Sequence, residues 1–484
     1  MCPLTWGEIL KMFLCKHRTT IAISLIIGLD RFIFNGFRAM IVLFLVKSLL
    51  YPDAKAFSIY GTLMMLAFLT PIVGGWISDR YLDKKFSIFI GFLWSLVGSL
   101  LLYLDKTNFF IGSSLILVGT GMVRPSAFPL FSDLIGRDSS NRDTKFTFLY
   151  AFMNLSTFLG TLVCAVLGEC IAWEFTFLAM IVANCAALVV LICLENKPII
   201  SVKEFSQKML GLCLAVAFTV LVFLFFRSGF NIPGSILTVV LLSVLVFCFI
   251  RLSTLQTDYK KLEMFGFTII FTILFFICYE QSGNSMVLFA DNNVDRNFGF
   301  LAKLGINFLP TTFFQLVDPI FNLILGSIIA MIWSYLERKN ITIKIFSKMS
   351  LGILFVGIGF LILALSSFFS HEGLVSPLFL IMGLMFFVIG ELCIVPVGLS
   401  FITKIAPQEN ASFYIGVWYF SIGIAQYLAG HVATLVAFNE NETSLDVTQN
   451  LVRYTHFFNE LFLICLGVTA TLYLTSRIRR INLG

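Results

Sequence analysis

The sequence is poor in the residues on which soluble enzymes depend. Only 12% of its 484 residues are charged and only four, far apart in the chain, are histidine, whereas soluble domains carry about 25% charged residues. The eleven cysteines include no Cys-x-x-Cys pair, so they predict neither a zinc site nor a disulfide framework. No glycine-rich phosphate loop occurs, which argues against an ATP-driven pump. We therefore expect no enzymatic activity, no metal and no cofactor.

The chain is instead rich in long apolar segments. It is 58% hydrophobic with a mean hydropathy of +0.95, and 55 residues are Phe. A helix that crosses a bilayer needs about 20 apolar residues. Fourteen segments are long enough: 20–48, 57–79, 86–104, 109–133, 146–170, 174–194, 208–226, 233–251, 264–290, 309–335, 349–370, 374–403, 411–438 and 455–476. The pattern predicts an all-α membrane protein with many spans.

Basic residues are distributed unevenly between the two sets of loops. With the N-terminus placed in the cytoplasm, 23 of the 33 Lys and Arg lie on the cytoplasmic side, 7 on the other side and 3 within the membrane. Cytoplasmic loops carry such an excess of basic residues. The asymmetry supports fourteen spans with both termini in the cytoplasm. It also explains the net charge of +6 without a nucleic-acid partner.

Two of the spans differ from the others. Segments 208–226 and 233–251 are Val-, Leu- and Phe-rich and have no internal charge. Without them, twelve spans remain, six on each side, which is the plan of secondary transporters. The predicted division is therefore an N-terminal six-helix bundle (1–194), a linker with two extra helices (195–263) and a C-terminal six-helix bundle (264–484).

Three arginines and one aspartate interrupt the apolar spans of the first half. Asp30, Arg31 and Arg38 lie in the first span, and Arg124 lies in the fourth, directly before Pro125. Arg31 and Arg38 are seven residues apart, so they share one helix face. Guanidinium groups facing inward suit an anionic ligand or a carboxylate, which Arg binds through paired hydrogen bonds. A structural salt bridge between Asp30 and an arginine is the alternative.

The second half carries acidic residues in corresponding surroundings. Glu280 follows the apolar run 265–276, Glu391 lies within 374–403, and Asp318 lies near the start of 309–335. An ionisable group in hydrocarbon is costly and normally faces a bundle interior or a water-filled cavity. We interpret the separation of cations and acids between the halves as a transport pathway. The alternative is that these charges only hold helices together.

Several stretches resemble a known family. The stretch 74–85, which contains Gly75, Asp79 and Arg80, is similar to the major facilitator signature after the second helix. The stretches 30–39, 74–82, 150–155, 279–296, 314–319, 391–407 and 416–430 resemble, in the same order, the proton-dependent oligopeptide transporters, a branch of that superfamily. The resemblance covers nearly the whole chain. It implies the major facilitator fold, and bacterial members also carry two extra helices between the halves.

The resemblance also implies roles for matched residues. Arg38 and Glu280 would form an outer-gate salt bridge that opens on protonation, and Asp30 and Arg31 belong to the proton-coupling motif. Further roles are a carboxylate site at Arg38 and Arg124, an amine site at Glu391 and Asp318, a hydrogen bond to the peptide backbone from Asn154, and a side-chain pocket at Trp418. Gly75, Asp79 and Arg80 would control the conformational change.

The chain departs from the family pattern at some of these positions. The family motif Glu-x-x-Glu-Arg reads Ile27 to Arg31 here, so its first acid is absent and its second is Asp30. Paired tyrosines are replaced by Phe34 and Asn35, and a usual asparagine is Asp318. These changes leave open a differently coupled or uncoupled carrier of amino acids or other small zwitterions.

The resemblance implies a proton-coupled symporter that imports di- and tripeptides by alternating access. We expect its partners to be a small peptide or amino acid, protons and membrane lipid. We expect a monomer in the cell inner membrane.

Overall fold

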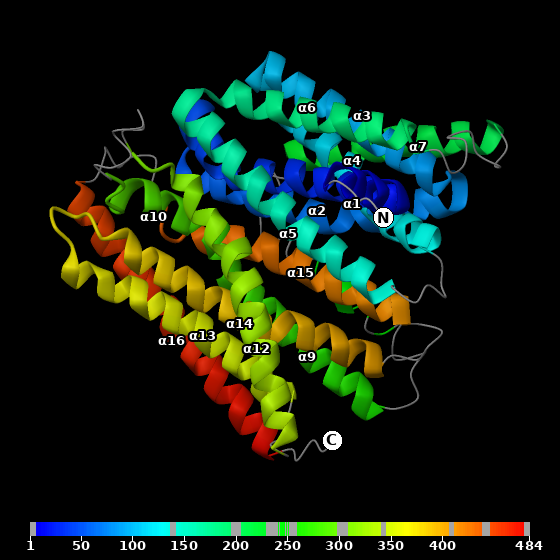
Figure 1. The fold of residues 1–484 in the computed structure, drawn as a ribbon. Helices are drawn as coiled ribbons and strands as arrows, with labels where there is room; N and C mark the ends of the chain where they lie inside the picture. The colour runs from blue at the N-terminus through cyan, green and yellow to red at the C-terminus, as the bar shows by residue number, and fades with distance from the viewer. Residues whose placement is uncertain are drawn as a thin grey trace. The chain divides into compact units, whose positions relative to one another are not determined.

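Helices account for nearly all of the chain in the computed structural model (Figure 1). The structure describes residues 6–135, 142–194, 205–228, 259–297, 308–339, 345–405, 411–437 and 446–478, with a few more between 241 and 250. The helices are α1 (Trp6–Leu43), α2 (Asp53–Tyr81), α3 (Lys84–Leu104), α4 (Phe109–Ile135), α5 (Arg142–Ala165), α6 (Trp173–Ile192), α7 (Phe205–Ser228), α9 (Tyr259–Tyr279), α10 (Ser285–Asn293), α12 (Val317–Arg338), α13 (Ile345–Leu365), α14 (Pro377–Ile405), α15 (Ala411–Ala433) and α16 (Val447–Ile478).

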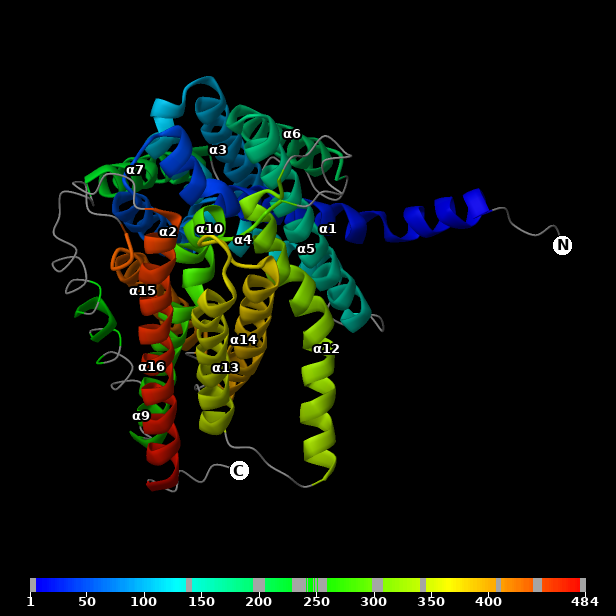
Figure 2. The ribbon, with the colours of Figure 1, turned by 90° about the vertical axis from the view of Figure 1, so that its left-hand side faces the viewer.

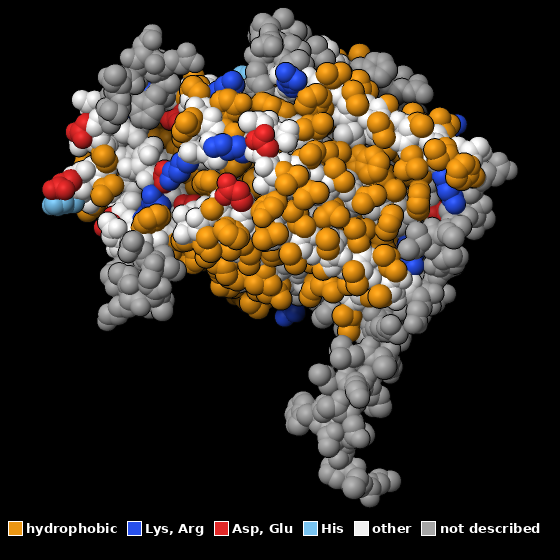
Figure 3. All heavy atoms as spheres, turned by 90° about the horizontal axis from the view of Figure 1, so that it is seen from above, with side chains coloured by type: hydrophobic (Ala, Val, Ile, Leu, Met, Phe, Trp, Pro, Cys, Tyr) orange, Lys and Arg blue, Asp and Glu red, His pale blue; other side chains and the backbone are white. Residues whose placement is uncertain are grey.

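Most of the predicted spans are helices in this structure. Within the described residues, eleven helical segments are long and apolar enough to cross a membrane. Helices α1 and α15 form over two further predicted spans, 20–48 and 411–438. The remaining predicted span, 233–251, lies largely outside the described residues. Large apolar side chains are exposed on many of these helices, and Figure 3 shows a face that is mostly apolar, as expected for helices that contact lipid chains.

By packing, the chain divides into two units. One unit contains Met1–Arg38 and Leu69–Arg227, and the other contains Ala39–Phe68 and Ser228–Gly484. The second unit therefore includes the end of α1 and the first part of α2. The sequence-based boundaries after 194 and 263 stay a prediction. We use "outer end" for the end of the helices near Lys47, Asp291 and Val447, following the orientation that loop charge predicts.

Glycine pairs let α3 and α4 pack closely in the first unit. A Cβ atom added at Gly91 would lie 2.6 Å from the carbonyl oxygen of Gly119. One added at Gly98 would lie 2.5 Å from the carbonyl oxygen of Gly112. Small residues at a helix contact allow the backbones to approach in this way.

The second unit repeats this arrangement in α13 and α14. A Cβ atom at Gly352 would lie 2.9 Å from the carbonyl oxygen of Gly390, and one at Gly359 would lie 2.7 Å from that of Gly383. Helices α13 and α14 run side by side, with α16 packed along α13 (Figures 1 and 2). The glycines are seven residues apart in all four helices. This repetition is consistent with two halves built on one plan.

Candidate functional site

A buried ion pair joins α1 and α4 in the first unit. Nε of Arg124 donates a hydrogen bond to Oδ2 of Asp30 across 3.0 Å, and the exposed fractions of the two side chains are 18% and 3%. The guanidinium also lies 4.1 Å from the centre of the Phe34 ring. Stacking on an aromatic face stabilises a cation that is out of water. Asp30 and Arg124, which the sequence placed in separate motifs, are therefore direct partners.

This ion pair keeps unused hydrogen-bonding atoms. Oδ1 of Asp30 and Nη2 of Arg124 are buried and have no hydrogen-bond partner in the described part of the chain. A buried polar atom without a partner costs free energy of about 1–3 kcal/mol. A carboxylate beside Arg124 would accept a hydrogen bond from Nη2 of Arg124, and a proton would bind to Oδ1 of Asp30. The pair is thus suited to bind an anion and a proton as well as to join two helices.

Helix α5 brings Asn154 toward α1. A Cβ atom at Gly160 would lie 2.4 Å from the carbonyl oxygen of Phe32, so α5 and α1 are nearly in backbone contact. Nδ2 of Asn154 is buried without a hydrogen-bond partner within the described residues. One turn further along α5, Thr157 accepts a hydrogen bond from Nδ2 of Asn35, which also donates to the carbonyl oxygen of Arg31. The spare amide of Asn154 fits the predicted role of a donor to a peptide carbonyl.

Four residues form an acidic cluster in the second unit: Tyr279, Asp318, Asn322 and Glu391. The hydroxyl of Tyr279 donates to Oε2 of Glu391 across 2.8 Å. Nδ2 of Asn322 donates to the same oxygen across 3.1 Å and also to Oδ1 of Asp318. Asp318 and Glu391, predicted to act together, are thus joined by one amide. The carboxylates are partly exposed, so a cationic ligand can reach them.

Asn322 is a site residue that the sequence reasoning missed. It lies four residues after Asp318 in α12, and residues four apart share a helix face. An amide one turn beyond a predicted acid in an apolar span was the available signal.

Glu280 lies where the helix of α9 and α10 is interrupted. Residues Glu280–Gly283 form a tight turn between the two helices, and Glu280 is only 2% exposed. Nε2 of Gln281 donates to the carbonyl oxygen of Ala429 in α15 across 3.0 Å, which anchors the turn. Both polar atoms of the Asn284 side chain are buried without a partner among the described residues. Interrupted membrane helices are typical of transport sites.

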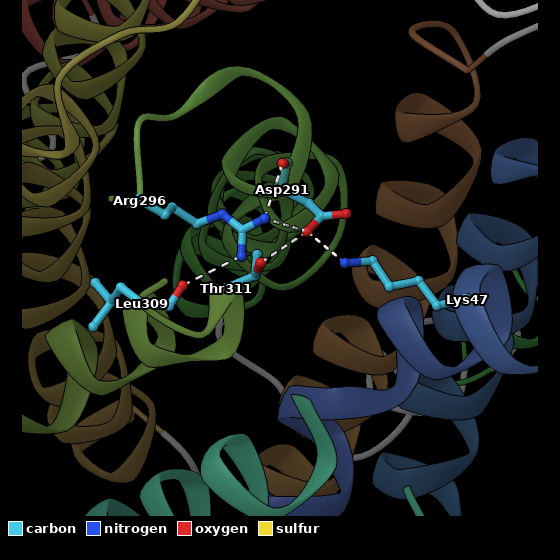
Figure 4. Close-up of polar contacts among 5 residues, drawn as sticks. All are labelled: Lys47, Asp291, Arg296, Leu309 and Thr311. Carbon is cyan, nitrogen blue, oxygen red and sulfur yellow. Dashed lines mark hydrogen bonds and ion pairs between the residues drawn. The ribbon is translucent and has the colours of Figure 1, made fainter. Parts of the chain in front are cut away.

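A second group of charges, the outer cluster, lies at the outer end of the second unit (Figure 4). Oδ1 of Asp291 accepts from Nζ of Lys47 at 2.6 Å, from Nη2 of Arg296 at 2.8 Å and from the hydroxyl of Thr311 at 3.0 Å. Arg296 also donates to the carbonyl oxygen of Leu309. One carboxylate thus joins the segment Phe44–Ser48, which follows α1, to α10 and to Thr311. The sequence predicted no role for Lys47, and Arg296 was placed only at the end of the family-like stretch 279–296.

The remaining predicted site residues lie in different surroundings. Trp418 is buried, and its Nε1 donates to the hydroxyl of Thr272 across 3.1 Å. Gly75 faces Pro125 of α4, while Asp79 and Arg80 are exposed at the end of α2. The roles of these residues, and those of Arg31 and Arg38, stay predictions. No group of three His, Cys, Asp or Glu side chains suited to a metal ion occurs in the part of the chain that the structure describes.

Comparisons with known proteins agree on one family. The model of the POT family matches residues 86–451. The chain is 28% identical to dipeptide and tripeptide permease A of Cronobacter turicensis, over 92% of this chain and 89% of that protein. It is 27% identical to dipeptide and tripeptide permease B of Salmonella typhimurium, over 92% of this chain and 91% of that protein.

Solved structures share the fold. A crystal structure of tetrameric PepTSo2 matches with a TM-score of 0.82 at 24% identity, over 96% of this chain and 100% of that chain. A structure from work on substrate recognition in proton dependent oligopeptide transporters matches with a TM-score of 0.81 at 24% identity, over 96% and 99%. The predicted fold class is confirmed.

Proposed function

Because this chain belongs to the POT family of membrane transporters, we propose that it imports di- and tripeptides together with protons. The observation that carries the proposal is the Asp30–Arg124 pair, which is buried in an apolar bundle yet keeps one donor and one acceptor unused. A pair that only joined two helices would be expected to satisfy its hydrogen bonds. The permeases of Cronobacter turicensis and Salmonella typhimurium are named for dipeptides and tripeptides, which supports the same substrates here.

The proposed substrate site grips a zwitterion at both ends. Arg38 and Arg124 bind the carboxylate, since Arg pairs with carboxylates through parallel hydrogen bonds. Glu391 and Asp318 bind the ammonium group. Asn154 donates to a backbone carbonyl. The proposal thus assigns the carboxylate to residues of the first half of the sequence and the ammonium group to residues of the second.

Trp418 lines the side-chain pocket in this proposal. Its indole is buried and held by Thr272. A rigid aromatic wall of this kind limits the size of the side chain that the pocket accepts.

Proton coupling is proposed to act through Glu280. When Glu280 is ionised it pairs with Arg38 and keeps the outer side closed; a proton on Glu280 releases Arg38 for the substrate carboxylate. Asp30 and Arg31 take part in the same coupling. The membrane potential adds about 2.3 kcal/mol per positive charge per 100 mV to inward movement.

The access change is proposed to use one end of α2 together with the outer cluster. Gly75, Asp79 and Arg80 lie at its cytoplasmic end in the proposed orientation, and the outer cluster lies at the other side of the membrane. Both termini are cytoplasmic in this proposal. The protein acts in the cell inner membrane, and each monomer, surrounded by lipid, is a complete transport unit.

The test is uptake of a labelled dipeptide into proteoliposomes with an imposed pH gradient. Acidification outside should stimulate uptake by the unmodified protein, and Glu280→Gln should abolish this stimulation while keeping peptide exchange between equal concentrations. Glu174→Gln, which changes an exposed glutamate in the first turn of α6, is the matched control and should behave like the unmodified protein. Normal proton-driven uptake by Glu280→Gln would remove Glu280 from coupling.

A second candidate is a carrier of amino acids or other small zwitterions with different coupling. It is favoured by Asn35, which replaces a family tyrosine and is held by Thr157 and the Arg31 carbonyl instead of facing a ligand. A binding panel of free amino acids, dipeptides and tripeptides separates the two. Tight binding of free amino acids without peptide binding would favour the second candidate.

A further inference from the structure

An apolar groove on the second unit has one carboxylate at its edge. The groove has a volume of about 220 Å³ and lies between α9, α13, the end of α15 and α16. Leu274, Ile353, Val432 and Val468 represent its aliphatic walls, and the thiols of Cys278 and Cys465 meet inside it at 3.6 Å. Among the residues that the structure describes, Glu460 is the only charged one that lines it. The groove takes no part in the transport site described above.

The groove is accessible from the outside of the bundle. Ile464 and Leu435 at its edge are 53% and 73% exposed. Only 28% of the apolar window of α16 is buried inside the molecule. Helix α16 packs against α13 (Figure 2) and is a candidate membrane span. Its side that faces away from the bundle therefore lies in the membrane. A molecule dissolved in the bilayer therefore reaches this groove without entering the transport pathway.

Glu460 lies on this span without a partner. It is exposed on α16, and no hydrogen bond or ion pair joins it to another residue among those that the structure describes. It lies inside the candidate span Val447–Leu472, five residues after the start of the apolar segment 455–476, which is about 8 Å along the axis. A carboxylate at such a depth normally pairs with a cation or marks a ligand site.

The other charged groups on the same side of α16 lie toward its outer end. His456 precedes Glu460 by one turn and is exposed. Arg453 precedes it by two turns and donates to the carbonyl oxygen of Ala437 across 3.1 Å, so it is held away. The groove beside Glu460 is thus apolar on every wall, and the carboxylate is the one feature that selects a ligand.

We propose that this groove binds a single-chain alkylammonium amphiphile that enters from the bilayer, with the ammonium group on Glu460 and the alkyl chain along the apolar walls. The ammonium group supplies the counter-charge that the Glu460 carboxylate lacks. Its hydrogens donate to the carboxylate oxygens, which makes a charge-assisted hydrogen bond. The volume of about 220 Å³ is below the range of about 300–1,000 Å³ that holds drug-sized ligands, so the groove suits one alkyl chain and not a larger molecule. The site is independent of the proposed peptide transport.

Three molecules with the same alkyl chain and different head groups test the proposal. Labelled dodecylammonium, dodecanol and dodecyl sulfate are dialysed to equilibrium against the protein in phosphatidylcholine nanodiscs at neutral pH. Empty nanodiscs correct for partition into lipid. The protein should bind dodecylammonium about tenfold more tightly than dodecanol, a difference of about 1.4 kcal/mol, and should not bind dodecyl sulfate.

Variants locate the site. Glu460→Gln should abolish the preference for dodecylammonium, and Ile464→Trp, which fills the groove edge but keeps the carboxylate, should weaken binding of dodecylammonium and dodecanol alike. Both positions are exposed, so neither change disturbs the core. Glu174→Gln is the matched control and should bind like the unmodified protein. Occupancy should also slow alkylation of Cys465 by an apolar maleimide, read by peptide mass spectrometry.

Several outcomes would overturn the proposal. Equal binding of the three molecules, or dodecylammonium binding that survives Glu460→Gln, shows that the carboxylate selects nothing. Binding that is unchanged by Ile464→Trp places the ligand elsewhere. A dimer that dissociates on Glu460→Gln, without any preference for dodecylammonium, assigns this surface to a second copy of the chain.

Discussion

Tyr279 donates its hydroxyl hydrogen to Oε2 of Glu391 across 2.8 Å. This bond links the last residue of α9, next to Glu280, to the proposed amine site on α14. The proposed proton-coupling residue Glu280 is therefore adjacent in sequence to a direct hydrogen-bond partner of the proposed amine site. We expect a change at Glu391 to affect Glu280 through this side chain.

Tyr279→Phe should weaken peptide binding through the amine end. The carboxylate of Glu391 loses one donor, and hydrogen bonds to charged groups contribute about 1.5–3 kcal/mol. We expect the KM for a dipeptide to rise about tenfold with little change in kcat. Uptake of labelled dipeptide as a function of concentration measures both values.

An N-acetylated dipeptide provides the contrast for Tyr279→Phe, because it has no ammonium group for Glu391 to bind. Its weak inhibition of uptake should not change in the variant. Tyr150→Phe, at an exposed tyrosine of α5, is the control for loss of a hydroxyl. An equal rise in KM in both variants would contradict the assignment.

Variants of the Asp30–Arg124 pair should change thermal stability and transport in different ways. Asp30→Asn leaves the guanidinium in a largely buried place without its counter-charge, and breaking a buried pair costs about 3–5 kcal/mol. Arg124→Gln leaves the buried carboxylate alone. The double variant Asp30→Asn, Arg124→Gln removes both charges and should recover most of the lost thermal stability.

Transport should not recover in the double variant as stability does. All three should fail to take up peptide against a gradient, because each loses the proposed carboxylate site or the proposed proton site. Thermal unfolding in detergent and uptake in proteoliposomes are measured on the same preparations. A stable double variant that still transports would show that the pair has only a structural role.

Much of the fold could be predicted because the length and hydropathy of a segment identify it as a membrane span. Helices formed where apolar runs predicted them, and the glycine pairs that join α3 to α4 and α13 to α14 recur at a spacing of seven. These are local properties of each segment. The span 233–251 lies largely outside the described residues, so its helix stays a prediction.

The site was predictable as a list of residues and less so as a set of partners. Asp30 and Arg124 were both named, yet their pairing depends on how α1 packs on α4, across 94 residues of chain. Asn322 was missed because its one signal was its position one turn beyond Asp318. Asp291 accepts three hydrogen bonds on one oxygen, which only the fold brings together.

The outer cluster should depend more on Arg296 than on Lys47. The exposed fraction of the Lys47 side chain is 40%, and such an ion pair contributes about 0–1 kcal/mol after screening. The Arg296 side chain is 15% exposed and also donates to the carbonyl oxygen of Leu309. Arg296→Ala should therefore lower the melting temperature by several degrees, and Lys47→Ala should barely change it.

Salt distinguishes the two contacts further. Raising the ionic strength screens exposed charges, so it should remove whatever stabilisation Lys47 supplies and leave that of Arg296 largely intact. Melting curves at low and high salt measure this. Equal sensitivity of both variants to salt would contradict the difference in burial.

Close contact between α2 and α15 should control closure of the outer side. A Cβ atom at Gly61 would lie 2.9 Å from the Cα of Gly430, and one at Gly430 would lie 2.7 Å from the carbonyl oxygen of Phe57. These neighbours are backbone atoms that cannot turn aside. An added methyl group should therefore push the helices apart and favour the state in which the outer side is open.

Gly61→Ala and Gly430→Ala should slow peptide uptake about tenfold, since overpacking costs about 1–3 kcal/mol in the closed state that transport must pass through. A cysteine introduced at Ser58, near the outer end of α2, should become more reactive toward an impermeant maleimide in both variants. Gly467→Ala, where an added Cβ would meet nothing within 4 Å, is the control. Unchanged labelling in the Gly61 and Gly430 variants would mean that this contact does not limit opening, because the methyl groups would then be accommodated without moving α2 from α15.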